Sequence, residues 1–110
     1  MEKTTETKAA EILGKIRNYF DGKSRVYKVL VFGSYARGTQ DARSDIDILV
    51  VHDSERRFFY RHEDFLDLWD LVPLSIDLLS YTPEEWERIK DRLFFQKILK
   101  EGVTIYEHGK

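Results

Sequence analysis

Apolar residues follow two different spacings along this chain, one typical of strands and the other typical of helices. Strand side chains point alternately to two faces, and short apolar runs predict strands over residues 26–32, 45–52, 74–81 and 103–107. Apolar residues three and four positions apart predict helices over residues 6–20, 54–71 and 82–102, with a short helix at 34–37. We therefore expect one α/β domain over residues 1–110 (α+β in some schemes), with a small mixed sheet of three or four strands covered by helices.

Residues 82–85, Thr-Pro-Glu-Glu, carry a strong helix-start signal. The threonine can cap the helix, the proline suits the first helical position, and Glu85 can reach back to the cap. Pro73 is expected to end the preceding helix and Gly102 to end the last one. These signals set the expected limits of the two helices that flank the third strand.

Two carboxylates stand at the start of the second predicted strand. Alternation places Asp45 and Asp47 on one face, while Ile46, Ile48 and Val50 face a core on the other. Carboxylates at the mouth of a buried strand are costly without a partner, and their mutual repulsion raises an apparent pKa of the pair. Such oxygen ligands suit Mg²⁺, which takes one or two carboxylates together with water and substrate phosphate. The pair therefore predicts a divalent-cation site.

A small-residue turn precedes this pair and ends the first predicted strand. Gly33 allows a tight turn and a close approach to a ligand, and Ser34 offers a hydroxyl group. The backbone amides that follow are unpaired where a helix begins, and such an end binds phosphate. Arg37 and Arg43 lie in the following loop, where each is either a solvated side chain or a triphosphate contact. The turn and the carboxylates together describe a site for a nucleoside triphosphate.

The spacing Gly33-Ser34, ten residues, Asp45-x-Asp47 resembles the signature of the polymerase-β-type nucleotidyltransferases, and in so short a chain it resembles the minimal nucleotidyltransferases. The resemblance implies a polymerase-β-like core and a third carboxylate on the next strand, for which the chain offers Asp77. It also implies that these three aspartates are catalytic and hold two Mg²⁺ ions, for which Mn²⁺ can substitute.

The same resemblance implies a reaction and a partner. The expected enzyme moves a nucleoside monophosphate, AMP from ATP in the favoured case, onto a hydroxyl group. Many minimal nucleotidyltransferases are antitoxins of all-helical HEPN proteins, so the expected acceptor is a tyrosine of such a toxin. The alternative is a non-catalytic binding module that neutralises a HEPN partner by occlusion. Transfer to a small molecule such as an antibiotic is less favoured, because no acceptor domain is expected in 110 residues.

Composition and charge exclude several classes of binding partner and site. A net charge of −2 provides no basic field for a long nucleic acid. Without cysteine there is no disulfide framework, thiol nucleophile or Cys-based zinc site. The polar first eight residues do not resemble a signal peptide, and no apolar run approaches the roughly 18 residues of a membrane span, so a cytoplasmic location without membrane contact is expected.

Two features concern surfaces rather than catalysis. The three histidines lack metal-ligand spacing and are expected to be surface or packing residues. The aromatic residues, Trp 2, Tyr 6 and Phe 7, bunch at residues 58–60 and 94–95 and exceed what one stripe per helix can bury. They predict an apolar interface with the helical partner or in a homo-oligomer.

Overall fold

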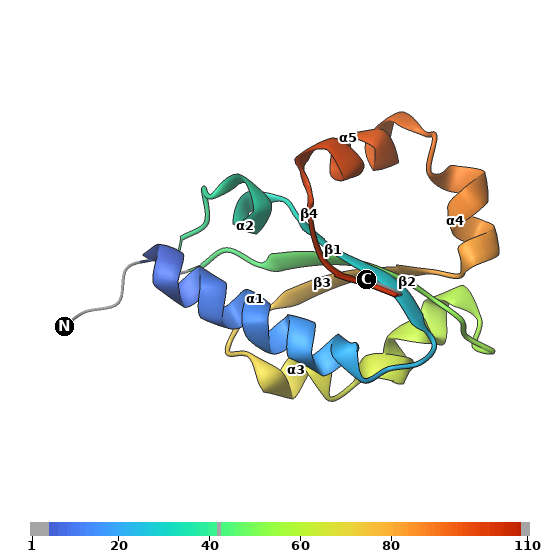
Figure 1. The fold of residues 1–110 in the computed structure, drawn as a ribbon, viewed down its shortest axis with the longest axis horizontal. Coiled ribbons are helices and arrows are strands. Elements are labelled where there is room, and N and C mark those ends of the chain that lie inside the picture. Colours follow the sequence, from blue (N-terminus) through green and yellow to red (C-terminus); the bar gives the residue numbers. More distant parts are fainter. Residues whose placement is uncertain (1–4, 42, 109–110) are drawn as a thin grey trace.

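A computed structural model describes residues 5–41 and 43–108 and is built around a four-stranded sheet (Figure 1). The strands are β1 (Val26–Phe32), β2 (Ile46–His52), β3 (Ile76–Tyr81) and β4 (Val103–Glu107). They lie in the order β3, β2, β1, β4 across the sheet. β1 is antiparallel to β2 and β4, whereas β2 and β3 are parallel. This mixed α/β sheet confirms the predicted fold class.

Helices cover both faces of this sheet (Figure 1). The described residues form α1 (Thr5–Asp21), α2 (Ser34–Arg37), the 3-10 helix η1 (Phe58–Phe65), α3 (Leu68–Leu71), α4 (Pro83–Ile89) and α5 (Leu93–Glu101). α1, η1 and α3 pack on one face, and α4 and α5 pack on the other. No described helix has the length and apolar character that a membrane crossing requires.

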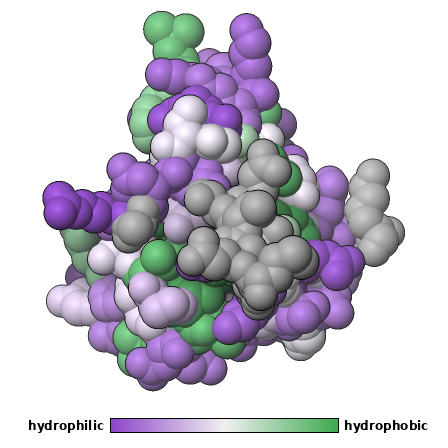
Figure 2. Space-filling view, turned by 90° about the vertical axis from the view of Figure 1, so that its left-hand side faces the viewer, coloured by the Kyte–Doolittle hydropathy of each residue, from purple (hydrophilic) through white to green (hydrophobic). Residues whose placement is uncertain are grey.

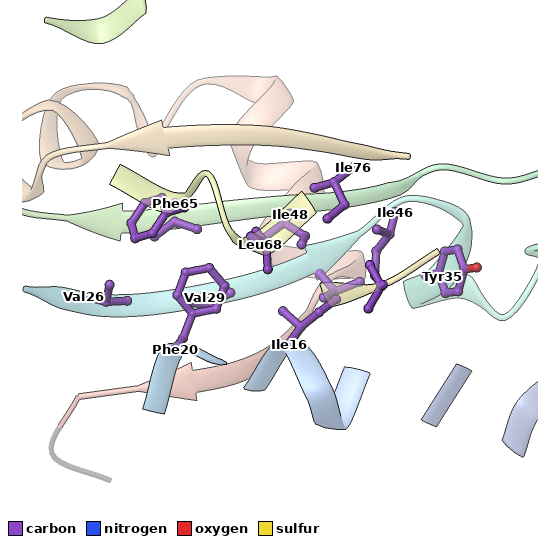
Figure 3. Packing of buried hydrophobic residues seen from close by; sticks show 13 residues of the cluster. Ile16, Phe20, Val26, Val29, Tyr35, Ile46, Ile48, Phe65, Leu68 and Ile76 are labelled. Carbon is purple, nitrogen blue, oxygen red and sulfur yellow. The ribbon is translucent and has the colours of Figure 1, made fainter. Parts of the chain in front are cut away.

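The two faces of β2 have the alternation that the sequence predicts. One face supplies the larger core, drawn in Figure 3, which includes Ile46, Ile48 and Val50 and is closed by Ile16 and Phe20 of α1. The other face begins with Asp47 and continues with Leu49 and Val51, which pack beneath α4 and α5. The helices α4 and α5 therefore lie on the same side of the sheet as the Asp47 carboxylate.

The prediction of one continuous helix over residues 54–71 is wrong. The structure has η1 and the one-turn α3 instead, and α3 ends before Pro73. Ser54 Oγ donates a hydrogen bond to Asp64 at 2.6 Å and accepts one from the Arg56 N–H at 3.1 Å. Such side-chain bonds compete with helical ones and hold residues 54–56 outside a helix.

The single helix predicted over residues 82–102 is also wrong, because the chain bends between α4 and α5. Its start is confirmed, since Thr82 and Glu85 form the complete capping box. α4 ends at Ile89, and the Gln96 side chain donates a hydrogen bond at 2.8 Å to the Lys90 carbonyl that the helix leaves free. The bend lets Trp86 of α4 and Phe95 of α5 contact each other and the sheet in one apolar cluster.

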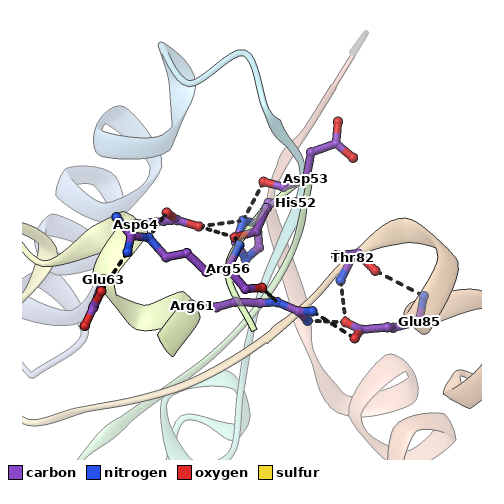
Figure 4. A network of polar contacts seen from close by, with 9 residues as sticks. His52, Asp53, Arg56, Arg61, Glu63, Asp64, Thr82 and Glu85 are labelled. Carbon is purple, nitrogen blue, oxygen red and sulfur yellow. Dashed lines mark hydrogen bonds and ion pairs between the residues drawn. The ribbon is translucent and has the colours of Figure 1, made fainter. Parts of the chain in front are cut away.

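A polar network ties η1 to α4 at the end of β2 remote from Asp47 (Figure 4). Arg61 is buried and forms two hydrogen bonds with the Glu85 carboxylate, one of them 2.9 Å long. His52 is 1% exposed and packs its ring edge-on against Phe65, with 4.8 Å between ring centroids. His52 is thus a packing residue, which is one of the two roles expected from the sequence.

Candidate active site

The turn after β1 brings the backbone against the Asp47 carboxylate. Gly33 has φ 71° and ψ −149°, a conformation that is essentially restricted to glycine. A Cβ atom at this position would overlap Asp47 Oδ2, so a side chain and the carboxylate cannot share the space. The carbonyl of Gly33 accepts hydrogen bonds from the N–H groups of Ala36 and Arg37, both 3.1 Å long. Gly33 is therefore required for the close approach of this turn to Asp47.

Asp47 and Asp77 face each other across two neighbouring strands. The parallel register pairs Asp47 with Asp77, and adjacent strands lie roughly 4.8 Å apart. Burial raises the pKa of Asp47, and the charge of Asp77 and a hydrogen bond with it raise the pKa further. The charge of Asp45 adds to this effect, whereas Arg37 opposes it. The carboxylates of Asp47 and Asp77 are therefore close enough to repel each other when both are ionised.

This donor set fits a divalent cation, because a cation would neutralise the repulsion that raises the Asp47 pKa. Two carboxylates suffice for Mg²⁺, which fills its remaining positions with water and phosphate oxygens. Within residues 5–41 and 43–108, no three Asp, Glu, His or Cys side chains are grouped to hold a metal ion. Asp45 is exposed and precedes β2 instead of starting it. The structure thus brings Asp47 and Asp77 together and leaves Asp45 beside them.

A pocket of about 330 Å³ opens beside Asp47, a volume within the range of small-molecule sites. One side is formed by the end of β1, the following turn and β2, and the other by α5. Its lining residues are Phe32, Gly33, Arg37, Asp47, Phe94, Lys97, Ile98 and Glu101. Arg37 Nη1 lies 3.5 Å from Glu101 Oε2, an exposed ion pair of the kind that contributes about 0–1 kcal/mol.

The residues predicted to bind the phosphates lie at different distances from the pocket. Ser34 is half-buried in the first turn of α2, next to Gly33. Arg43 is exposed, and its backbone N–H donates a 2.8 Å hydrogen bond to Asp41 Oδ1 in a tight turn. Of the two arginines, the structure brings Arg37 to the pocket and does not bring Arg43 there.

Five pocket residues were not expected at the site from the sequence: Phe32, at the end of β1, and Phe94, Lys97, Ile98 and Glu101, all on α5. Lys97 and Glu101 are four positions apart, but an exposed Lys-Glu pair is ordinary on a helix and does not indicate a site. Their placement depends on the bend before α5, which the apolar spacing did not predict.

Two solved structures share this fold across most of the chain. The "Crystal structure of a putative nucleotidyltransferase from Sulfolobus solfataricus" has a TM-score of 0.63 at 21% identity, covering 99% of this chain and 93% of that one. A structure of a "tri-AMPylated Shewanella oneidensis HEPN toxin in complex with MNT antitoxin" has a TM-score of 0.60 at 20% identity, covering 90% and 72%. At these identities the likeness concerns the fold alone.

Sequence comparison identifies the family. A Methanocaldococcus jannaschii relative, "Putative protein adenylyltransferase MJ0128", is 37% identical over 76 residues, which cover 69% of this chain and 70% of the relative. The family model described as "Polymerase beta, Nucleotidyltransferase" matches residues 14–110, a span that includes the turn, the paired carboxylates and α5. The chain belongs to the polymerase beta nucleotidyltransferase family.

Proposed function

We propose that this nucleotidyltransferase moves AMP from ATP onto a tyrosine hydroxyl of a helical HEPN-type partner and thereby acts as its antitoxin. The observation that carries the proposal is the Gly33 turn packed against Asp47, with Asp77 opposite and a pocket alongside. The name of the M. jannaschii relative, a protein adenylyltransferase, supports AMP as the transferred group and a protein as the acceptor.

Asp47 and Asp77 would hold Mg²⁺, or Mn²⁺ in its place, with Asp45 completing the set for two ions. Divalent cations in such sites neutralise phosphate charge and lower the pKa of an attacking hydroxyl. The protein's part is positional, because paired strands fix both carboxylates before any substrate arrives. Asp77, which is exposed, would serve as a metal ligand or as the base that accepts the proton of the tyrosine hydroxyl.

The phosphates would be held by the Gly33–Ser34 turn and by arginine. Arg37 lines the pocket, and its 3.5 Å pair with Glu101 is weak enough to be exchanged for phosphate oxygens. Arg43 would contribute from the loop only after a movement of its side chain toward the pocket. Asp47 and Arg37 line the same pocket, so the carboxylates and the arginine would act on one bound triphosphate.

A row of aromatic rings leads from the pocket to the surface and offers a docking site for the partner. Phe94 lines the pocket and contacts Phe95, which contacts Tyr81, with ring centroids 5.1 and 5.5 Å apart. The row continues through Phe58 to Phe59, with both centroid distances 5.6 Å. Phe59 is 82% exposed, and Leu93, which precedes Phe94 on α5, is 89% exposed. A helical protein that contacts Phe94, which is exposed and lines the pocket, would place a side chain near Asp47.

Apolar side chains also project at the top of the space-filling view, where Figure 1 places α5 and the turn before it (Figure 2). The exposed rings of this aromatic row, Phe58, Phe59 and Phe94, favour the second candidate function, in which docking alone neutralises the partner by occlusion. In that case Asp47 would be dispensable for antitoxin action.

The test incubates the protein with ATP, Mg²⁺ and the purified HEPN-type partner and follows the intact mass of the partner. We expect the mass of one or more AMP groups on the partner, localised to tyrosine by fragmentation, together with release of pyrophosphate. Transfer of a terminal phosphate, or an unmodified partner in the presence of bound ATP, would refute AMP transfer.

A further inference from the structure

The pocket beside Asp47 contains as many acidic as basic side chains. Asp47 and Glu101 face Arg37 and Lys97 within a pocket of about 330 Å³. Such a balance does not attract a polyanion unless some of the acidic groups are neutralised or some of the cations are uncommitted. The partners of each charged group therefore decide which side chain can bind phosphate.

Arg37 already has an acidic partner, which phosphate oxygens would have to replace. Its guanidinium pairs with Glu101 at 3.5 Å and lines the same pocket as the Asp47 carboxylate. Lys97 differs, because its side chain forms no hydrogen bond or ion pair with any described residue. Among the described residues of the pocket, Lys97 is thus the cation without an internal partner.

We propose that Lys97 on α5 binds the triphosphate of the nucleotide, so that α5 forms the second wall of the nucleotide site. This assignment rests on the proposed function and adds a residue to it. A lysine ammonium is a compact, strongly hydrated charge on a flexible stem, which suits contact with phosphate oxygens. Lys97 lines the pocket from α5, the wall that the glycine turn and the aspartates do not supply.

The test measures the dissociation constant for ATP with Mg²⁺ by calorimetry in wild type, Lys97→Ala, Lys97→Arg and Lys100→Ala. Lys100 is the matched control, because it is exposed on the same helix and does not line the pocket. We expect Lys97→Ala to weaken ATP binding about tenfold, as for the loss of a charge-assisted hydrogen bond. Lys97→Arg should retain most of the affinity, and Lys100→Ala should stay within about twofold of wild type.

Salt dependence separates a phosphate contact from a structural role. The wild-type dissociation constant should rise more steeply with salt than that of Lys97→Ala, because one screened ion pair is gone, while melting temperatures without ATP stay equal. Wild-type affinity in Lys97→Ala, or equal losses in the Ala variants of Lys97 and Lys100, would overturn the assignment even if the partner is labelled. Loss only in Lys97→Ala, with an unlabelled partner, would uphold it and refute the proposed acceptor instead.

Discussion

The surroundings of the Asp47 carboxylate disfavour its ionised form. Burial and the carboxylate of Asp77 both raise its pKa, so the ionised side chain opposes folding near neutral pH. A residue selected for stability would be uncharged here. Functional side chains often lower the free energy of unfolding, and replacing such a side chain then stabilises the fold.

Asp47→Asn should therefore raise the melting temperature at neutral pH without divalent cations. Asparagine preserves the shape of the side chain and removes its repulsion with Asp77. Adding Mg²⁺ and ATP should raise the melting temperature of wild type and leave that of Asp47→Asn nearly unchanged, because only a competent site gains by mass action. Thermal unfolding by circular dichroism checks both statements. An equal shift in both proteins would mean that the cation binds elsewhere.

Gly33→Ala should disrupt the same site by changing the turn that packs against Asp47. Alanine at φ 71° and ψ −149° costs about 1–3 kcal/mol, and its Cβ would displace the Asp47 carboxylate. Both stability in urea and AMP transfer should fall. Gly14→Ala is the control, because Gly14 lies within α1 with open space around it, and alanine there should stabilise by about 0.5–1 kcal/mol. Normal transfer by Gly33→Ala would show that the close packing is dispensable.

At the scale of elements, one carboxylate connects η1 to α4. Glu85 completes the capping box with Thr82 and also pairs with Arg61, which is buried. Removing one partner of a buried pair leaves the other charge uncompensated and costs about 3–5 kcal/mol, whereas losing a cap costs about 1 kcal/mol. The ion pair should therefore matter more than the cap.

Glu85→Gln should destabilise the protein more than Thr82→Ala, while Glu84→Gln, an exposed neighbour in the same turn, should have little effect. The Arg61 hydrogen bond lowers the pKa of Glu85 below its ordinary value of 4.5. The stabilisation is thus complete above about pH 4.5 and is lost as the pH falls through the lower pKa of the folded state. Urea unfolding from pH 3 to pH 7 should show the Glu85→Gln difference shrink at the acidic end. A constant difference would exclude the ion pair as its cause.

The elements also show what the sequence could predict. β1, α1 and the capping box follow from local spacing, and β2 and β3 begin one and two residues later than predicted. Alternation placed Asp47 on one face of its strand, whereas Asp77 was expected beside it from the family resemblance, and the parallel register pairs the two. The α5 wall was not predictable, because the bend before it depends on how Trp86 and Phe95 pack on the sheet. The form of residues 54–71 depends likewise on Asp64 accepting bonds from Ser54 and Arg56.

At the scale of the whole molecule, the aromatic row connects the surface to the pocket. Phe59, at the outer end of the row, and Leu93, at the start of α5, are both more than four-fifths exposed and contribute little to the core. Phe59→Ser with Leu93→Ser should therefore leave the melting temperature unchanged and abolish co-purification with the HEPN-type partner. Leu66→Ser is the control, because Leu66 is 59% exposed in the segment between η1 and α3. Retained partner binding by the double variant would place the interface elsewhere.

The central claim is that the carboxylate pair transfers AMP to the partner, and the rate of partner labelling from ATP labelled at the α-phosphate tests it most directly. Wild type should label the partner and suppress its activity, whereas Asp47→Ala and Asp77→Ala should each lose most of the rate, because they remove groups that act on charge developing in the transition state. Asp53→Ala is the control, since Asp53 lies beyond the opposite end of β2 and outside the pocket beside Asp47. If wild type leaves the partner unlabelled yet suppresses it, and Asp47→Ala suppresses it equally well, the account is contradicted and the protein acts by occlusion.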